Sequence, residues 1–193
     1  NELETVIPGE FNESVVLSQL EVTEYDYLGE YSDCAFLVIK NNSDYTLAIS
    51  ANVQFYNTAG DLIGVGDASQ EAVGPGTETI LPIWADEEFA NIEYKLEASQ
   101  EEHYESVVEE LSHETTPAAD KEILAVTNNG SAPAEFVEGY VLFFNGDTVV
   151  GYDSNYFTDD DNEIKPGETI MEEMDCYEHY DSIKVYLTGR RSI

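Results

Sequence analysis

The stretch Val38-Ile39-Lys40-Asn41-Asn42-Ser43 returns later in the chain as Ala125-Val126-Thr127-Asn128-Asn129-Gly130. In both places an apolar, β-branched run ends in two asparagines and a small turn residue, as a strand does where it enters a tight turn. Other segments recur in the same order, at a separation that stays at about 90 residues. These pairs are 13–16 with 105–108, 52–56 with 140–144, 60–61 with 146–147, 62–64 with 149–151, 75–80 with 166–170 and 92–96 with 183–187. Their order predicts that one unit has been duplicated.

Within each copy, the apolar residues alternate with polar ones over short runs, which is the period of a β-strand. Alternation places Phe36 and Val38 on one face of a strand, and the intervening residues face water or the opposite side. A sheet with one apolar face buries that face against a second sheet. Six or seven short strands in about 90 residues predict an immunoglobulin-like β-sandwich. The fold class expected is therefore all-β, with two tandem sandwiches related by internal duplication.

The expected domains are residues 1–101 for the first copy and 102–193 for the second, with almost no linker between them. The segment Ile92 to Leu111 also fits a helix, since apolar residues fall there at helical spacing. Two strands are preferred, because the matching segment Ser182 to Thr188 alternates as a strand does.

Acidic residues dominate the charge of the chain: 41 Asp and Glu stand against 7 Lys and Arg, for a formal net charge of −34. The excess is even, with 19 acidic and 2 basic residues up to Gln100 and 22 acidic and 5 basic residues after it. Such a surface repels nucleic acid and anionic lipid, whose phosphates require clustered Lys and Arg. The pair Arg190-Arg191 is too little for a nucleic-acid site. Solubility is the plainest explanation of the acidity, and cation binding is the alternative.

The two cysteines, Cys34 and Cys176, have neither a zinc-binding spacing nor a CxxC pattern. Two separate buried thiols are expected, and a disulfide between the copies is the alternative. No apolar run is long enough to cross a membrane, so we expect no membrane insertion by this segment, and no signal peptide is visible.

At its turn and core residues the chain resembles the FxLYD-type and related immunoglobulin-like modules of exported or membrane-anchored proteins of Gram-positive gut bacteria. The residues that carry the resemblance are 126–130, 133–137, 141–144, 158–161, 164–167 and 186–191, and more loosely 41–44 and 74–76 in the first copy. The resemblance implies the fold and a location outside the cytoplasm. It brings no biochemical function and no site residues.

The best candidate for a metal site is the acidic loop Asp159-Asp160-Asp161-Asn162-Glu163, with Asp153 and Asn155 upstream. Hard cations such as calcium take oxygen ligands, and bound calcium would relieve the repulsion between these carboxylates. The ligand set would be Asp159, Asp160, Asp161 and Glu163. However, the spacing is not that of an EF-hand, and a solvated acidic loop is the competing interpretation.

Catalytic chemistry has little support in the sequence. There is no Gly-x-Ser-x-Gly elbow and no phosphate-binding glycine loop. A Cys176–His179 pair is conceivable, yet their spacing near a strand end does not aim the two side chains together. His103 and His113 lie near the expected domain boundary.

Tyrosines form the other candidate surface, because an exposed tyrosine contacts peptides or sugar rings at low entropic cost. They gather as Tyr25, Tyr27 and Tyr31 in the first copy and as Tyr152, Tyr156, Tyr177 and Tyr180 in the second. Half-buried strand positions explain them equally well. Trp84 is assigned to packing in the core or between sheets.

The function expected is that of a non-catalytic, extracytoplasmic segment of a secreted or cell-surface protein. It would act as a spacer or bind an unknown protein or glycan ligand, without a cofactor. A calcium-dependent adhesion module is one alternative, and a carbohydrate-active or metal-dependent hydrolase is another.

Overall fold

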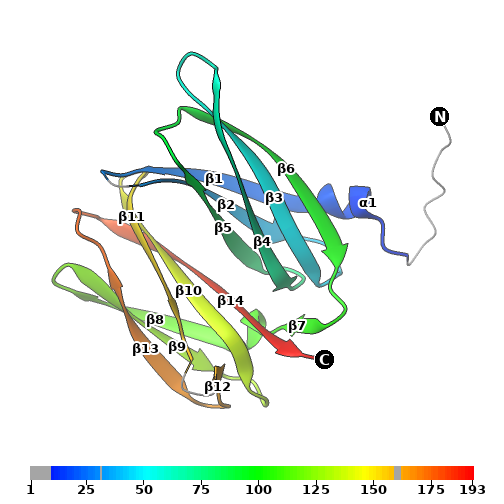
Figure 1. The fold of residues 1–193 in the computed structure, drawn as a ribbon. Helices are drawn as coiled ribbons and strands as arrows, with labels where there is room; N and C mark the ends of the chain where they lie inside the picture. Colours follow the sequence, from blue (N-terminus) through cyan, green and yellow to red (C-terminus); the bar gives the residue numbers. More distant parts are fainter. Residues whose placement is uncertain (1–9, 31, 159–161) are drawn as a thin grey trace.

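The computed structural model describes residues 10–30, 32–158 and 162–193, which form an almost purely β-structure (Figure 1). The first half holds α1 (Glu13–Leu17), β1 (Leu20–Leu28), β2 (Asp33–Asn41), β3 (Leu47–Tyr56), β4 (Leu62–Val73), β5 (Glu78–Ala85) and β6 (Asn91–Gln100). The second half holds β7 (Tyr104–Ser106), the 3₁₀ turn η1 (Val108–Glu110), β8 (Leu111–Ala118), β9 (Lys121–Asn128), β10 (Ala134–Asn145), β11 (Thr148–Tyr156), β12 (Glu163–Ile164), β13 (Thr169–Asp175) and β14 (Ser182–Ser192).

Each half is a sandwich of two antiparallel sheets. In the first half the strand orders are β1-β2-β5 and β4-β3-β6. In the second half they are β8-β9-β13 and β11-β10-β14, with β7 added beside β14 and β12 beside β10. The two halves therefore share one strand order, β1 to β6 corresponding in turn to β8, β9, β10, β11, β13 and β14. This confirms the all-β sandwich prediction. The duplication itself and the division at residues 101 and 102 stay predictions.

Each sandwich has its own apolar core. Ala35, Leu37 and Ile39 on β2 pack with Val53 and Phe55 on β3 in the first half. The alternation along these strands directs every second side chain between the sheets. The core of the second half is built in the same way, from residues such as Leu124, Val126, Val141 and Phe143.

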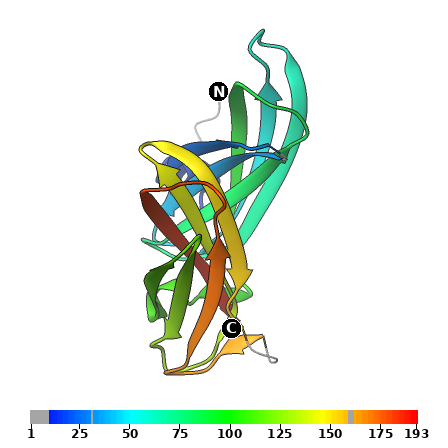
Figure 2. The same ribbon diagram turned by 90° about the vertical axis from the view of Figure 1, so that its left-hand side faces the viewer.

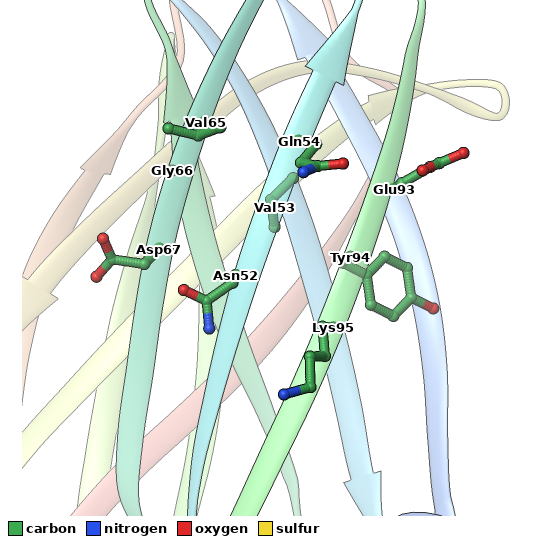
Figure 3. A pocket seen from close by; sticks show the side chains of 9 residues that line it. All are labelled: Asn52, Val53, Gln54, Val65, Gly66, Asp67, Glu93, Tyr94 and Lys95. Carbon is green, nitrogen blue, oxygen red and sulfur yellow. The ribbon is translucent and has the colours of Figure 1, made fainter. Parts of the chain in front are cut away.

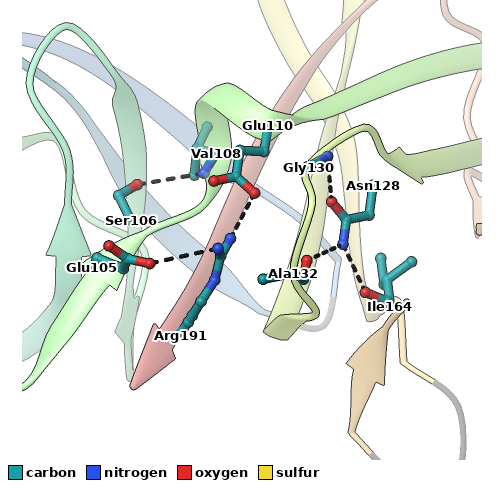
Figure 4. Close-up of polar contacts among 9 residues, drawn as sticks. All are labelled: Glu105, Ser106, Val108, Glu110, Asn128, Gly130, Ala132, Ile164 and Arg191. Carbon is teal, nitrogen blue, oxygen red and sulfur yellow. Dashed lines mark hydrogen bonds and ion pairs between the residues drawn. The ribbon is translucent and has the colours of Figure 1, made fainter. Parts of the chain in front are cut away.

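A buried asparagine holds the strand end in each half. The Asn41 amide donates hydrogen bonds to the carbonyls of Tyr45 and Val73 at 2.8 and 2.9 Å. Asn128 does the same with the carbonyls of Ala132 and Ile164, at 2.9 and 2.8 Å (Figure 4). A backbone carbonyl buried without a donor is costly, and each of these amides donates both to its own turn and to a distant segment. The first asparagine of the repeated Asn-Asn sequence thus makes the same buried hydrogen bonds in both halves.

A third apolar cluster lies between the two halves, where β1-β2-β5 meets β11-β10-β14 (Figures 1 and 2). Its buried members are Cys34, Phe36, Val38, Ile80, Leu142, Phe144, Val149 and Tyr186. Tyr25, Tyr27, Tyr140 and Tyr152 pack around it. The molecule is therefore a stack of four sheets with three apolar layers.

This arrangement corrects one expectation about burial. β2 is apolar on both faces, so Phe36 and Val38 do not face the core of their own sandwich but the second half. Trp84, assigned to the core or to packing between sheets, takes the second place: it is 50% exposed and packs against Tyr152 of the second half, with ring centroids 5.4 Å apart. The local alternation gave the faces correctly, but only the contact between halves decides what each face meets.

The segment between the halves is extended, as expected. β6 ends at Gln100 and β7 begins at Tyr104, so the strand interpretation of residues 92–111 is confirmed. Within the described residues, none of the helices combines the length and the apolar character needed to span a membrane.

Candidate functional site

One candidate site is a groove on the outer face of the β4-β3-β6 sheet in the first half. It has a volume of about 470 Å³, and a second depression of about 410 Å³ continues the same face toward Ser50 and Ser99. The larger one is lined by Asn52, Val53, Gln54, Val65, Gly66, Asp67, Glu93, Tyr94 and Lys95 (Figure 3). Because Val53 points into the core, Asn52 and Gln54 on either side of it must point outward.

The chemistry of this groove is polar and acidic. The hydroxyl of Tyr56 donates to Gln54 Oε1 at 2.8 Å and to Glu93 Oε2 at 3.2 Å. Lys95, which lies opposite Asn52 in the groove, pairs with Glu97 at 2.6 Å. In the part of the chain that the structure describes, the amide of Asn52 has no hydrogen-bonding partner. Free amide groups beside carboxylates suit a neutral or cationic polar ligand and repel an anionic one.

The matching face of the second half is already occupied. Strand pairing places Asn52 where the second half has Tyr140, and Gln54 where it has Leu142. In the second half this face is apolar and covered by β1-β2-β5, and in the first half it is polar and open. The contact between the halves therefore covers the outer face of β11-β10-β14 and leaves the matching face, on β4-β3-β6, open.

The predicted calcium site cannot be placed as a whole. Asp159, Asp160 and Asp161 lie outside the described residues. Glu163 begins β12, which pairs with β10. Upstream, the carboxylate of Asp153 accepts the main-chain N–H of Asp175 at 2.8 Å, and the amide of Asn155 donates to Glu172 at 3.3 Å. In the described ranges, no three or more His, Cys, Asp or Glu side chains gather closely enough to hold a metal ion.

Cys176 and His179 line one depression of about 690 Å³ together with Tyr177 and Tyr180, but the Cys176 thiol donates to the carbonyl of Glu178 at 3.5 Å. Both cysteines are free and buried, the thiol arrangement we expected. Burial raises the pKa of the Cys34 thiol to about 12, against the lowering effect of a main-chain hydrogen bond at Ile83. The pKa of the Cys176 thiol is likewise raised by burial, whereas His179 is exposed. A buried, protonated thiol is a poor nucleophile.

The tyrosines, for which exposed loops and half-buried strand positions were both open, are divided between these two environments. Tyr25, Tyr27 and Tyr152 lie at the contact between the halves, where the Tyr27 and Tyr152 rings meet edge to face at 5.3 Å. Tyr31 lies outside the described residues. Tyr156 and Tyr177 are exposed. The half-buried alternative is therefore confirmed for the tyrosines that join the halves.

Tyr180 is half-buried: it packs on Phe143 and donates a hydrogen bond to Glu122 at 3.0 Å. His103 and His113 are both exposed. The two arginines that are too few for a nucleic-acid site form ion pairs within the chain. Arg190 pairs with Glu71, and Arg191 pairs with Glu105 and Glu110.

The groove was missed at the level of sequence, although a signal was present. The alternation Asn52-Val53-Gln54-Phe55 assigns two amide side chains to an outer face, and Tyr140 and Leu142 stand at the matched positions of the second copy. A difference in polarity between matched positions indicates that the two faces have different neighbours. What those neighbours are depends on the stacking of the halves.

Comparisons with known proteins add little to this geometry. No protein-family model matches the chain, and no curated protein matches it. Among solved structures, red sea bream transglutaminase is similar over 90% of this chain, with 10% sequence identity and a TM-score of 0.29. The chain spans 29% of the length of that protein.

Proposed function

We propose that this chain is a non-catalytic, extracytoplasmic segment that acts as a rigid two-unit spacer in a secreted or cell-surface protein. The observation that carries the proposal is the apolar cluster between the halves. Neighbouring domains move relative to one another unless their contact is large and apolar. Here Phe36, Leu142 and Phe144 are buried in that contact.

Two further contacts support a fixed angle between the halves. Arg190 at the end of β14 forms an ion pair with Glu71 of the first half. The short strand β7, which follows directly from the first half, pairs with β14. A connection that joins the sheet of the next unit leaves little freedom for a hinge.

The extracytoplasmic location rests on the resemblance to exported modules, and the acidic surface agrees with a soluble segment. Antibody labelling of intact cells that produce the protein tests this location directly. Labelling seen only after the cells are broken would contradict it.

The rigid arrangement is tested by small-angle X-ray scattering on the whole chain. We expect the wild-type curve to fit one arrangement of the halves. Leu142→Glu places a charge in the apolar contact and is expected to broaden the range of arrangements. Gln54→Glu is the matched control, because it puts the same side chain at the corresponding open position.

Near-ultraviolet circular dichroism of both variants checks that the two cores stay folded. If the wild-type scattering requires a broad ensemble, or if Leu142→Glu scatters like Gln54→Glu while folded, the chain is not a rigid spacer.

Ligand binding at the groove is a second candidate function, which the unpartnered Asn52 amide favours. A protein or neutral glycan ligand would use Asn52 and Gln54. Binding that survives replacement of both residues by alanine would place the ligand elsewhere.

A further inference from the structure

The contact between the halves uses two different faces. We name the outer face of β11-β10-β14 the receiving face and the outer face of β1-β2-β5 the docking face. Leu142, Phe144 and Val149 belong to the receiving face, and Phe36 and Val38 to the docking face. Because the two faces differ, this is a heterologous contact, and each half also carries the face that it does not use here.

The unused faces can be aligned residue by residue through the strand pairing. On the first half, Tyr56 pairs with Leu62 just after a β-bulge, as Phe144 pairs with Val149. On the second half, Ala125 pairs with Met171 as Val38 pairs with Ile80. The groove described above is therefore the receiving face of the first half, and the outer face of β8-β9-β13 is the docking face of the second.

Three of the large apolar side chains exposed on this molecule lie on these unused faces. Leu62 and Val65 are 54% and 71% exposed, and Met171 is 65% exposed. Their counterparts in the contact between the halves are Val149, Tyr152 and Ile80. Leu62, Val65 and Met171 are thus exposed at positions where the other half makes its contact.

For a contact between the halves, the strand pairing identifies the two residues that hold the same positions on the unused faces. Tyr152 packs on Phe36 at 5.1 Å, and the corresponding pair is Val65 with Ile123, both apolar. Lys184 donates to the Tyr25 hydroxyl at 2.6 Å.

The pair that corresponds to Lys184 and Tyr25 is Glu93 with Thr116, a carboxylate and a hydroxyl that can donate to it. Both transferred pairs are chemically compatible. The β8-β9-β13 face also carries Glu114 and Glu173, and the groove carries Asp67 and Glu93, so repulsion between carboxylates opposes the contact at low salt.

We propose that a second copy of this chain docks onto the first, with the β8-β9-β13 face of one copy bound in the β4-β3-β6 groove of the next. A heterologous contact of this kind adds copies end to end. The contact is weaker than the one between the halves, since Asn52 and Gln54 replace aromatic and aliphatic side chains. Salt strengthens it, because screening reduces the repulsion between chains of net charge −34.

Sedimentation velocity over a range of protein concentrations tests the proposal, in about 0.05 M and about 0.5 M NaCl. We expect concentration-dependent association that is at least tenfold tighter in the higher salt. Val65→Asp removes the groove contact and Met171→Asp removes the opposing contact, so each variant alone is expected to remain monomeric. Val15→Asp, an exposed apolar position on α1 outside both faces, is the matched control and is expected to associate like the wild type.

An equal mixture of the Val65→Asp and Met171→Asp chains distinguishes end-to-end docking from any symmetric dimer. Each variant keeps one intact face, so the mixture is expected to form dimers and nothing larger. A wild-type chain that stays monomeric in high salt at millimolar concentration overturns the proposal. So does association that Val65→Asp and Met171→Asp leave unchanged, or a mixture that stays monomeric.

Discussion

At the scale of single residues, Asn41 and Asn128 hold the same place in the two halves, at the end of β2 and of β9. Both side chains are fully buried, and each joins its own turn to a distant loop. Their oxygen atoms accept the main-chain N–H of Ser43 and Gly130, respectively. This position needs a neutral side chain that donates two hydrogen bonds and accepts one, which a hydroxyl cannot do and an amide can.

Replacing Asn128 by alanine is expected to lower the free energy of unfolding by at least about 2 kcal/mol, because two buried carbonyls lose their donor. Asn129→Ala is the control, since its exposed amide bonds the hydroxyl of Ser112. That variant is expected to change the free energy by less than about 0.5 kcal/mol. Urea unfolding measures both, and equal losses in the two variants would contradict this role of Asn128.

At the scale of elements, β7 is a three-residue strand whose place depends on two arginines. Arg191 lies 2.6 Å from Glu110 and 3.5 Å from Glu105, and its side chain is mostly buried (Figure 4). Arg190 stacks over the ring of Tyr104, 4.1 Å from its centroid. Partly buried ion pairs hold their geometry better than exposed ones, which contribute little.

Hydrogen exchange of the β7 amides measures what this anchoring contributes. Arg191→Ala is expected to speed their exchange by about tenfold, since local opening no longer breaks two ion pairs. The strands of the first core should exchange as in the wild type. Lys95→Ala, which removes a fully exposed pair with Glu97, is the control and should leave β7 unchanged. Unaltered β7 exchange in Arg191→Ala would show that backbone pairing alone holds the strand.

At the scale of the whole molecule, the acidic charge makes stability depend on pH. Burial raises the pKa of Glu138, against hydrogen bonds from Tyr140, Tyr156 and Ser154 that lower it. The pKa of Asp26 is raised by burial and then by the neighbouring Glu24. A carboxyl group with a raised pKa in the folded chain binds more protons folded than unfolded. Its contribution to stability is complete below the unfolded pKa of about 4 and is lost as the pH rises through the folded pKa.

The free energy of unfolding is therefore expected to rise when the pH falls from about 7 to about 5. Reduced repulsion among the carboxylates acts in the same direction. Glu97, whose pKa is lowered by Lys95, has the opposite sign, but this pair is exposed and contributes little. Urea unfolding at several pH values measures the slope. Glu138→Gln should flatten it, and a wild-type stability that falls with acidification would refute the expectation.

The strands, the apolar faces along them and the repeated turn at Asn41 and Asn128 could be predicted from the local sequence. These depend on alternation and turn chemistry, which are properties of neighbouring residues. The stacking of the sheets was needed to show that Phe36 meets the second half, that Trp84 stays half exposed and that the Asn52 groove is left open. Those outcomes depend on which sheet stacks on which, and a strand that is apolar on both faces is compatible with more than one stacking order. The contact between residues far apart in the chain selects one of them.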